Sequence, residues 1–313
     1  MAGLYLHIPY CVKKCDYCDF VSFPDDGAIG EYVDLLIREI ELTAQAKLCN
    51  CTFDTVFFGG GTPSLLSGEQ MTRIMDALKT AFPIAEDAEC SMECNPGTAT
   101  PQNLRSYRAA GINRLSIGLQ TSHDSLLAAI GRIHTFLQFK DTLRAARDAH
   151  FDNISVDVMH GLPGQTQRAY LDTLKAVCDE QVRHISSYAL TLAEDTPLGA
   201  RVHAGEEQLP DADDVADMQD AGIDYLESRG YHRYEISNFA QPGFECRHNL
   251  NYWLNGEYLG LGVAAHSAVR LHEWTRYANV ETIREYERLI NRNRRPVREI
   301  IRLFPADEMF ECV

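Results

Sequence analysis

Three cysteines near the N-terminus constrain this chain more than any other feature. Cys11, Cys15 and Cys18 follow the apolar segment 4–8 and are spaced C-x₃-C-x₂-C. Such a loop gives a [4Fe–4S] cluster three ligands and leaves one iron without a cysteine, whereas clusters that only transfer electrons normally have four. Structural zinc also takes four ligands, and the sequence has no second C-x₂-C pair. The spacing therefore favours a cluster whose open iron binds a substrate or cofactor.

The composition allows a large hydrophobic core and argues against a polyanion as the main partner. The chain has 313 residues, 45% of them hydrophobic, which suffices for one large domain or one domain with an appendage. Its formal net charge of −16 argues against nucleic acid as a partner, because phosphate contacts need Lys and Arg. The sequence shows no signal peptide and no apolar run that could span a bilayer, so a cytoplasmic protein is predicted.

Short β-rich segments alternate with amphipathic helical segments up to about residue 197. Six such repeats with short connections predict an α/β fold, in which a parallel sheet is covered by helices. Periodicity leaves open whether the sheet is a partial barrel or an open, doubly wound sheet. The predicted strands are 4–8, 55–58, 89–93, 114–119, 153–159 and 184–192, and the predicted helices are 31–47, 70–81, 101–110 and 169–181, with further helical pieces up to 149.

The pattern changes after this point, which predicts a first unit over residues 1–197 and a smaller α+β extension over 198–313. Helices are expected at 211–229 and 282–293, an edge strand at 232–239, and a loop-rich segment at 243–262. Proline and two acids at 305–308 form a helix-start signal, but only five residues follow. We therefore expect a chain that is truncated at its C-terminus.

A glycine run follows the second predicted strand. Gly59, Gly60 and Gly61 precede Thr62 and Pro63, at the carboxyl end of the strand. Glycine lets a backbone approach a ligand closely, and the sites of barrel enzymes lie at this end of the strands. A tight turn between strand and helix explains the same residues, so the run alone decides nothing.

Polar side chains lie within or directly after three further predicted strands. Each of the residues Glu93, Gln120 and Asp157 stands within or at the end of an apolar segment, where a buried polar group needs a partner. That partner is either another protein group or a ligand. Arg132 follows the fourth strand and offers the planar fork that binds carboxylates, although a surface arginine would look the same.

The cysteine loop after a first strand, together with the glycine run, resembles the radical S-adenosylmethionine (SAM) superfamily. The resemblance implies a partial (β/α)₆ barrel, with the amino and carboxylate groups of SAM chelating the open iron. It also implies that Tyr17 shields the cluster and that the glycine segment holds the SAM amino group through its carbonyls.

A narrower resemblance extends over residues 3 to about 270. Segments 4–11, 59–63, 114–120, 155–163 and 246–253 are similar to the oxygen-independent coproporphyrinogen III oxidase family. The residues that this resemblance places in contact with SAM are Tyr5, Gly60, Gly61, Thr62, Glu93, Gln120, Arg132, Asp157 and Ala189.

Two departures separate this chain from the oxidases. Phe20 stands where the oxidases have a fourth cysteine, and the long extension that precedes their cluster motif is missing before Cys11. Both features resemble the haem chaperone branch of the family, whose members bind haem and pass it to respiratory proteins. This predicts that the chain does not decarboxylate coproporphyrinogen, and no catalytic residue is assigned.

The segment 247–253 carries the H-N-x-x-Y-W sequence of the haem chaperone branch. His248 could supply an axial nitrogen to haem iron, and Tyr252 and Trp253 offer flat faces to a macrocycle. Ordinary core packing of all three is the alternative.

A haem chaperone that uses a [4Fe–4S] cluster, SAM and haem is therefore the leading hypothesis. A coproporphyrinogen III oxidase performing two radical decarboxylations is the alternative, and the acidic charge disfavours a third class, a radical SAM enzyme that modifies RNA. Respiratory proteins are the expected recipients of haem, and peripheral contact with membrane-bound recipients and homodimer formation stay open.

Overall fold

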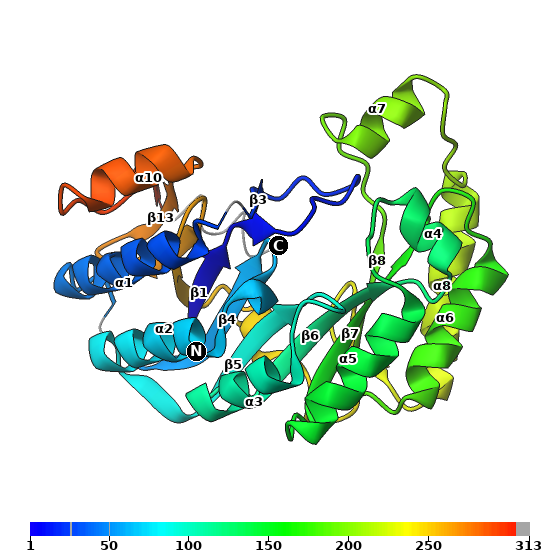
Figure 1. Ribbon diagram of the computed structural model, residues 1–313, viewed down its shortest axis with the longest axis horizontal. Coiled ribbons are helices and arrows are strands. Elements are labelled where there is room, and N and C mark those ends of the chain that lie inside the picture. The colour runs from blue at the N-terminus through cyan, green and yellow to red at the C-terminus, as the bar shows by residue number, and fades with distance from the viewer. Residues whose placement is uncertain (26, 50, 305–313) are drawn as a thin grey trace.

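The computed structural model describes residues 1–25, 27–49 and 51–304. Its main sheet is curved, and within it β1, β4, β5, β6, β7 and β8 are neighbours in chain order and run parallel (Figure 1). This confirms the predicted α/β fold with a parallel sheet. The bounds of these strands are β1 (Ala2–Ile8), β4 (Phe53–Gly60), β5 (Ile84–Cys94), β6 (Arg114–Gln120), β7 (Asn153–His160) and β8 (His184–Ala189).

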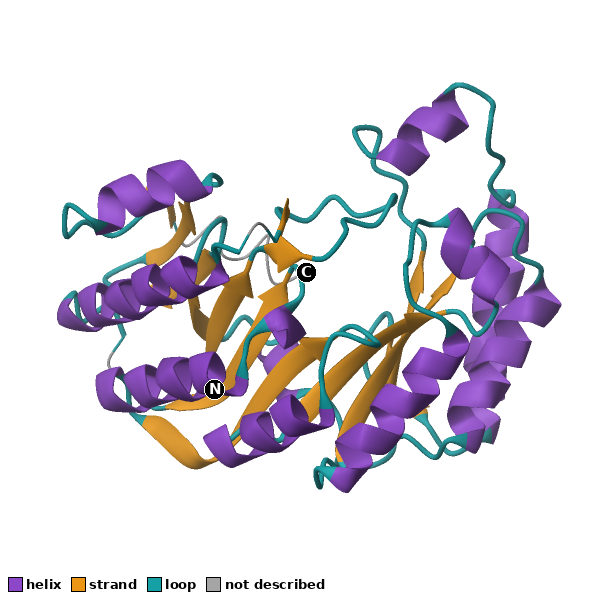
Figure 2. Ribbon diagram, in the orientation of Figure 1, coloured by secondary structure: helices purple, strands orange, loops and turns teal. Residues whose placement is uncertain are grey.

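Helices connect these strands and lie along the outer face of the sheet, as Figure 2 shows. Several begin with local capping chemistry: Ser67 forms a capping box with Gln70, and Thr135 forms one with Gln138. The helices of this part are α1 (Ile29–Gln45), the 3₁₀ turn η1 (Pro63–Leu65), α2 (Gly68–Ala81), α3 (Pro101–Ala110), α4 (Asp124–Ala129), α5 (Phe136–Asp148) and α6 (Gln167–Asp179).

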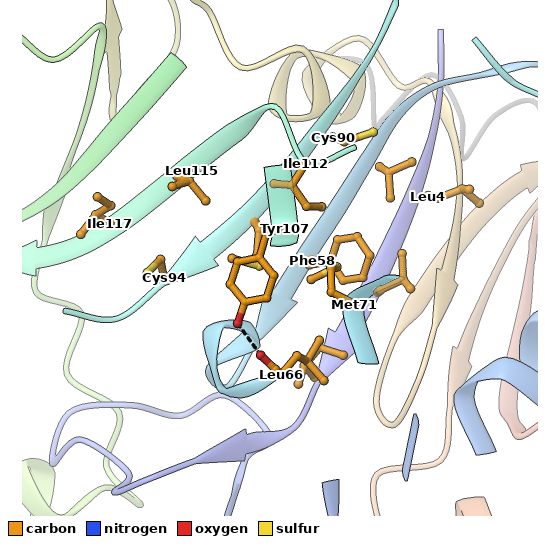
Figure 3. Packing of buried hydrophobic residues seen from close by; sticks show 14 of the residues in the cluster. Leu4, Phe58, Leu66, Met71, Cys90, Cys94, Tyr107, Ile112, Leu115 and Ile117 are labelled. Carbon is orange, nitrogen blue, oxygen red and sulfur yellow. Dashed lines mark hydrogen bonds between the residues drawn. The ribbon is translucent and has the colours of Figure 1, made fainter. Parts of the chain in front are cut away.

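The core lies between the helices and the outer face of the sheet. Along β1, Leu4, Leu6 and Ile8 are fully buried in it, and Tyr5 and His7 alternate with them toward the concave face. Figure 3 shows Tyr107 of α3 packed in this layer, where its hydroxyl donates a hydrogen bond to the carbonyl of Leu66. Because apolar side chains occupy the outer face, the polar strand residues gather on the concave face.

The C-terminal part extends the same sheet at both edges. On one edge β10 pairs with β8 and with β9; on the other β11 pairs in parallel with β1 and continues through β12, β13 and β14. The division at residue 197 stays a prediction. The elements of this part are α7 (Pro197–His203), α8 (Ala212–Ser228), β9 (His232–Arg233), β10 (Asn238–Ala240), α9 (Arg247–Trp253), β11 (Glu257–Leu261), β12 (His266–Arg270), β13 (Trp274–Asn279), α10 (Ile283–Ile290) and β14 (Val297–Leu303).

Two predictions for this part were wrong. The segment 232–239 is not one edge strand, because β9 and β10 turn back on each other as a hairpin. The segment 243–262 is not mainly loop, because it contains α9 and β11, and β11 is held by its pairing with the distant β1. The predicted helix start at 305–308 lies outside the described residues. Among the helices that are described, none has the length and apolar character needed to cross a membrane.

Candidate cofactor site and adjoining cavities

A cavity of about 380 Å³ opens at the carboxyl ends of the parallel strands. Strands β4 to β7 and the cysteine loop all contribute to its wall, as expected for a barrel-type site. It brings most of the predicted cluster and SAM residues together. Those that line it are Cys11, Cys15, Tyr17, Cys18, Gly60, Gly61, Thr62, Glu93, Gln120, Arg132 and Asp157.

The cysteine loop is closed by a short two-stranded ladder. Strand β2 (Tyr10–Cys11) pairs with β3 (Phe23–Pro24), which ties the two ends of the loop together. Asp16 anchors the middle of the loop, because its amide donates to the carbonyl of Ile130 at 3.1 Å and its carboxylate pairs with Arg201 at 2.8 Å. The loop is thus held at both ends and at its centre.

The three thiols face one cavity, with burial raising the pKa of Cys18. Lys13 and Lys14 line the same cavity, so positive charge lies near an anionic thiolate-bound cluster. Within the described residues, no three Cys, His, Asp or Glu side chains gather closely enough to share one metal ion. Three separate thiols around a cavity, with cations nearby, are a donor set that fits a [4Fe–4S] cluster.

Two carboxyl groups lie on the concave face beside the thiols. Glu93 accepts a hydrogen bond from the amide of Gly60 at 3.1 Å, and Asp157 accepts one from the hydroxyl of Ser116 at 2.9 Å. Burial raises the pKa of both, and the neighbouring Asp157 helps to raise the pKa of Glu93 to about 8. A pair of desolvated carboxyls in one cavity stabilises a bound cation, because the cation relieves their mutual repulsion.

Arg132 is a partly buried member of the site and not a surface arginine. Its Nη1 donates to Oδ1 of Asn95 at 2.9 Å, and its Nη2 donates to the carbonyl of Gly118 at 2.8 Å. Its Nε–H is enclosed and has no hydrogen-bond partner among the described residues, while the side chain as a whole lines the cavity. Asn95 was missed by the sequence analysis; its one signal was its place directly after Glu93 and Cys94 at the end of β5.

The backbone at the strand ends is unusual at two positions. Gln120 has a φ of 70°, at a point where the register between β6 and β7 shifts. A left-handed conformation is costly for a residue other than glycine and is concentrated at functional sites. Gly60 has a φ of 110°, and a Cβ there would lie 2.5 Å from the His7 ring. The glycine is therefore required by packing as well as by its place in the cavity wall.

Two residues of the predicted SAM set do not line this cavity. Tyr5 lies in an adjoining cavity, where its hydroxyl is 3.1 Å from Nδ1 of His7. Ala189 ends β8, and the preceding residue, Tyr188, lines the cavity in its place. Strand alternation explains this difference, because neighbouring residues of a strand point to opposite faces.

His248 is buried, with both ring nitrogens in hydrogen bonds. Nδ1 lies 2.7 Å from the hydroxyl of Thr55 on β4, and Nε2 lies 2.8 Å from the hydroxyl of Tyr252. The ring stacks on Phe57 with 5.1 Å between centroids, and burial lowers the pKa of His248 to about 3. In this arrangement neither nitrogen is open to iron, and the neutral imidazole holds α9 against the concave face of the sheet.

The two aromatics of the same motif are exposed. Tyr252 and Trp253 are 37% and 55% accessible, and both line a cavity of about 520 Å³ together with Tyr188 and Ile236. Glu89 of β5 holds the start of α9, because its carboxylate accepts from the amides of Arg247 and His248. The motif therefore has a buried histidine that positions the exposed ring of Tyr252.

A further cavity of about 490 Å³ lies beside the cluster cavity. Phe20 lines both cavities. Most of the wall of this further cavity was not predicted from the sequence, because the strands β11 to β13 lie in segments that carry no motif. The side chains that define it are Tyr5, His7, Phe20, Tyr252, Tyr258, His266, Trp274 and Arg276.

Comparisons with known proteins agree on one family. The sequence profile of the Radical SAM superfamily matches residues 5–177. The heme chaperone HemW of Escherichia coli is 40% identical over 272 residues, covering 85% of this chain and 70% of its own length. The heme chaperone HemW of Bacillus subtilis is 36% identical over 301 residues, covering 96% and 78%.

Among solved structures, the radical SAM enzyme coproporphyrinogen III oxidase (HemN) of Escherichia coli superposes with a TM-score of 0.86 at 25% identity. The match covers 99% of this chain and 74% of the oxidase. The identities of 40% and 36% to the chaperones place the sequence more narrowly than this shared architecture does. The chain belongs to the radical SAM superfamily and, within it, to the family of the heme chaperone HemW.

Proposed function

We propose that this protein is a haem chaperone that binds haem and delivers it to respiratory proteins in the cytoplasm. The observation that carries the proposal is the similarity to two heme chaperones along 85% and 96% of the chain. Membership of the radical SAM superfamily implies a [4Fe–4S] cluster and SAM as cofactors.

In this proposal Cys11, Cys15 and Cys18 hold the cluster, and Tyr17 covers it. Such a cluster supplies a cysteine-free iron at which SAM is chelated. The guanidinium of Arg132 would pair with the SAM carboxylate, and the carboxyls of Glu93 and Asp157 would balance the positive charge of SAM. Support comes from the single cavity that these residues share with Gly60, Gly61, Thr62 and Gln120.

Tyr5 and Ala189 lie outside that cavity and are left out of the proposed SAM site. For haem, the proposal uses the exposed ring of Tyr252 as a contact surface, because Tyr252 lines both the cavity of about 490 Å³ and the cavity of about 520 Å³. Trp253 lines only the cavity of about 520 Å³ and is left out of the proposed haem site. His248 acts by fixing the orientation of Tyr252.

A coproporphyrinogen III oxidase is the second candidate, because the HemN superposition covers nearly the whole chain. Phe20 disfavours it, since the oxidases carry a cysteine at that place. Anaerobic reconstitution with iron and sulfide, followed by parallel assays, separates the two. Haem binding without consumption of coproporphyrinogen supports the chaperone. Decarboxylation of coproporphyrinogen without haem binding supports the oxidase.

A further inference from the structure

The cavity beside the cluster loop contains two histidines in different chemical states. His7 is buried, with Nε2 2.8 Å from the carbonyl of Val21 and Nδ1 bonded to Tyr5, so both nitrogens are engaged. His266 is exposed, and its imidazole makes no hydrogen bond or ion pair with any described residue. Both ring nitrogens of His248 are also hydrogen-bonded. Of these three histidines, His266 is therefore the one whose imidazole is open to a metal.

The backbone that carries His266 is rigid. His266 begins β12 and pairs with Ala278 of β13. On its other side, the amide of Gly260 donates to the hydroxyl of Ser267 at 2.8 Å. A Cβ on Gly260 would lie only 2.0 Å from the carbonyl oxygen of His266, so the two strands approach as closely as glycine permits. The sheet therefore fixes the backbone position of His266, and its imidazole, which has no partner among the described residues, can turn to a ligand.

The cavity around His266 has the shape and lining of a site for a large flat ligand. Its volume of about 490 Å³ falls within the usual range for small-molecule sites. Tyr258, Trp274 and Phe20 supply aromatic surface, and Tyr252 packs edge-on against Tyr258 with 4.6 Å between ring centroids. Arg276 places a guanidinium in the same wall, and guanidinium groups bind carboxylates in a bidentate manner.

We propose that this cavity is the haem site, with the imidazole of His266 as an axial ligand to the iron. Trp274 and Tyr258 would offer apolar faces to the macrocycle, and Arg276 would pair with a propionate. The inference rests on the proposed haem-binding function and adds the site, the ligand and the orientation. Phe20 lines both this cavity and the cluster cavity, so a haem bound here lies next to the cluster loop.

The test uses the full chain, reconstituted anaerobically and titrated with haemin under absorption and electron paramagnetic resonance spectroscopy. His266→Ala should shift the Soret band and weaken haemin binding at least about tenfold, because the axial ligand sets the spectrum of haem. Added imidazole should restore the wild-type spectrum. Arg276→Ala should weaken binding with the Soret position unchanged, because it removes a propionate contact and no iron ligand.

The matched control is His272→Ala, an exposed histidine of the β12–β13 turn that does not line the cavity. It should bind haemin as the wild type does. Wild-type affinity and spectrum in His266→Ala would overturn the inference and leave the chaperone function standing. A wild-type chain that binds no haemin would overturn the chaperone function, and the inference with it.

Discussion

The hydroxyl of Thr62 donates a hydrogen bond to the sulfur of Cys11, with 3.4 Å between Oγ1 and Sγ. The same hydroxyl accepts a hydrogen bond of 2.9 Å from Nδ2 of Asn95, whose Oδ1 accepts one from Arg132. Because its oxygen is engaged by Asn95, the Thr62 proton is directed to the sulfur. The first cluster cysteine is thereby connected through two side chains to the arginine proposed to bind SAM.

Thr62→Val should lower the reduction potential of the cluster. A hydrogen bond to a ligating sulfur stabilises the more negative, reduced state, so its loss favours the oxidised state. One net hydrogen bond of about 1 kcal/mol corresponds to about 40 mV for a one-electron couple. A redox titration followed by electron paramagnetic resonance measures the shift. Thr62→Ser keeps the hydroxyl and should retain the wild-type potential; equal potentials for the valine variant and the wild type would contradict the prediction.

Replacing Cys11, Cys15 and Cys18 together by alanine should abolish the cluster. No other thiols of the described chain form a C-x₃-C-x₂-C loop, so the visible absorbance after reconstitution should disappear and bound iron should fall from about four per chain to near zero. Cys178→Ala removes a buried thiol of α6 outside the cavity and serves as the control. Normal reconstitution of the triple variant would show that the cluster is held elsewhere.

Glu93 should make the apoprotein less stable as pH rises. Its pKa is raised from 4.5 to about 8, so the folded state keeps a proton that the unfolded chain has already lost. This stabilisation is complete below about pH 4.5 and declines until about pH 8. Glu93→Gln removes this titration, so its free energy of unfolding relative to the wild type should increase by about 1–2 kcal/mol between about pH 6 and pH 8.

Urea unfolding of both proteins at the two pH values measures this difference. Glu39 is a second buried carboxyl, with its pKa raised to about 7, and it contributes equally to both proteins. The comparison of the two therefore cancels Glu39 and reports Glu93 together with its coupling to Asp157. A constant stability difference across the pH range would show that Glu93 titrates normally.

Removing the carboxyls of the proposed SAM site should weaken SAM binding. Asp157→Ala combined with Glu93→Ala takes away both carboxyl groups of the cavity, and hydrogen bonds to charged groups contribute about 1.5–3 kcal/mol each. Calorimetry of the reconstituted double variant should therefore show an affinity at least about tenfold lower. Asp172→Ala on the exposed side of α6 is the control. Unchanged affinity in the double variant would remove these two residues from the site.

His248→Ala should destabilise the fold. It removes the side chain that bonds both Thr55 and Tyr252 and stacks on Phe57, and loss of such a buried group costs about 2–4 kcal/mol. Thermal unfolding should show a lower midpoint. The Soret band of bound haem should keep its position, since the iron ligand is assigned to His266. A Soret shift without any loss of stability would instead identify His248 as the ligand.

Local sequence determined much of this protein. The positions of the six parallel strands and of the helices that begin at Pro101 and after Ser67 follow from alternation, proline and capping residues within a few positions of each other. The cysteine spacing and the glycines likewise mark one end of the barrel, because parallel strands bring their carboxyl ends to the same edge.

The tertiary structure alone decided which histidine is open. His248 and Thr55 are 193 residues apart in sequence, yet their hydrogen bond occupies Nδ1 of His248, one of the two nitrogens that the motif predicts as an iron ligand. His266 carries no motif, and its exposure in a cavity depends on β11 pairing with β1 at the far end of the chain. Hydrogen-bond occupancy and solvent access are set by contacts between distant segments, and neither spacing nor residue type encodes them locally.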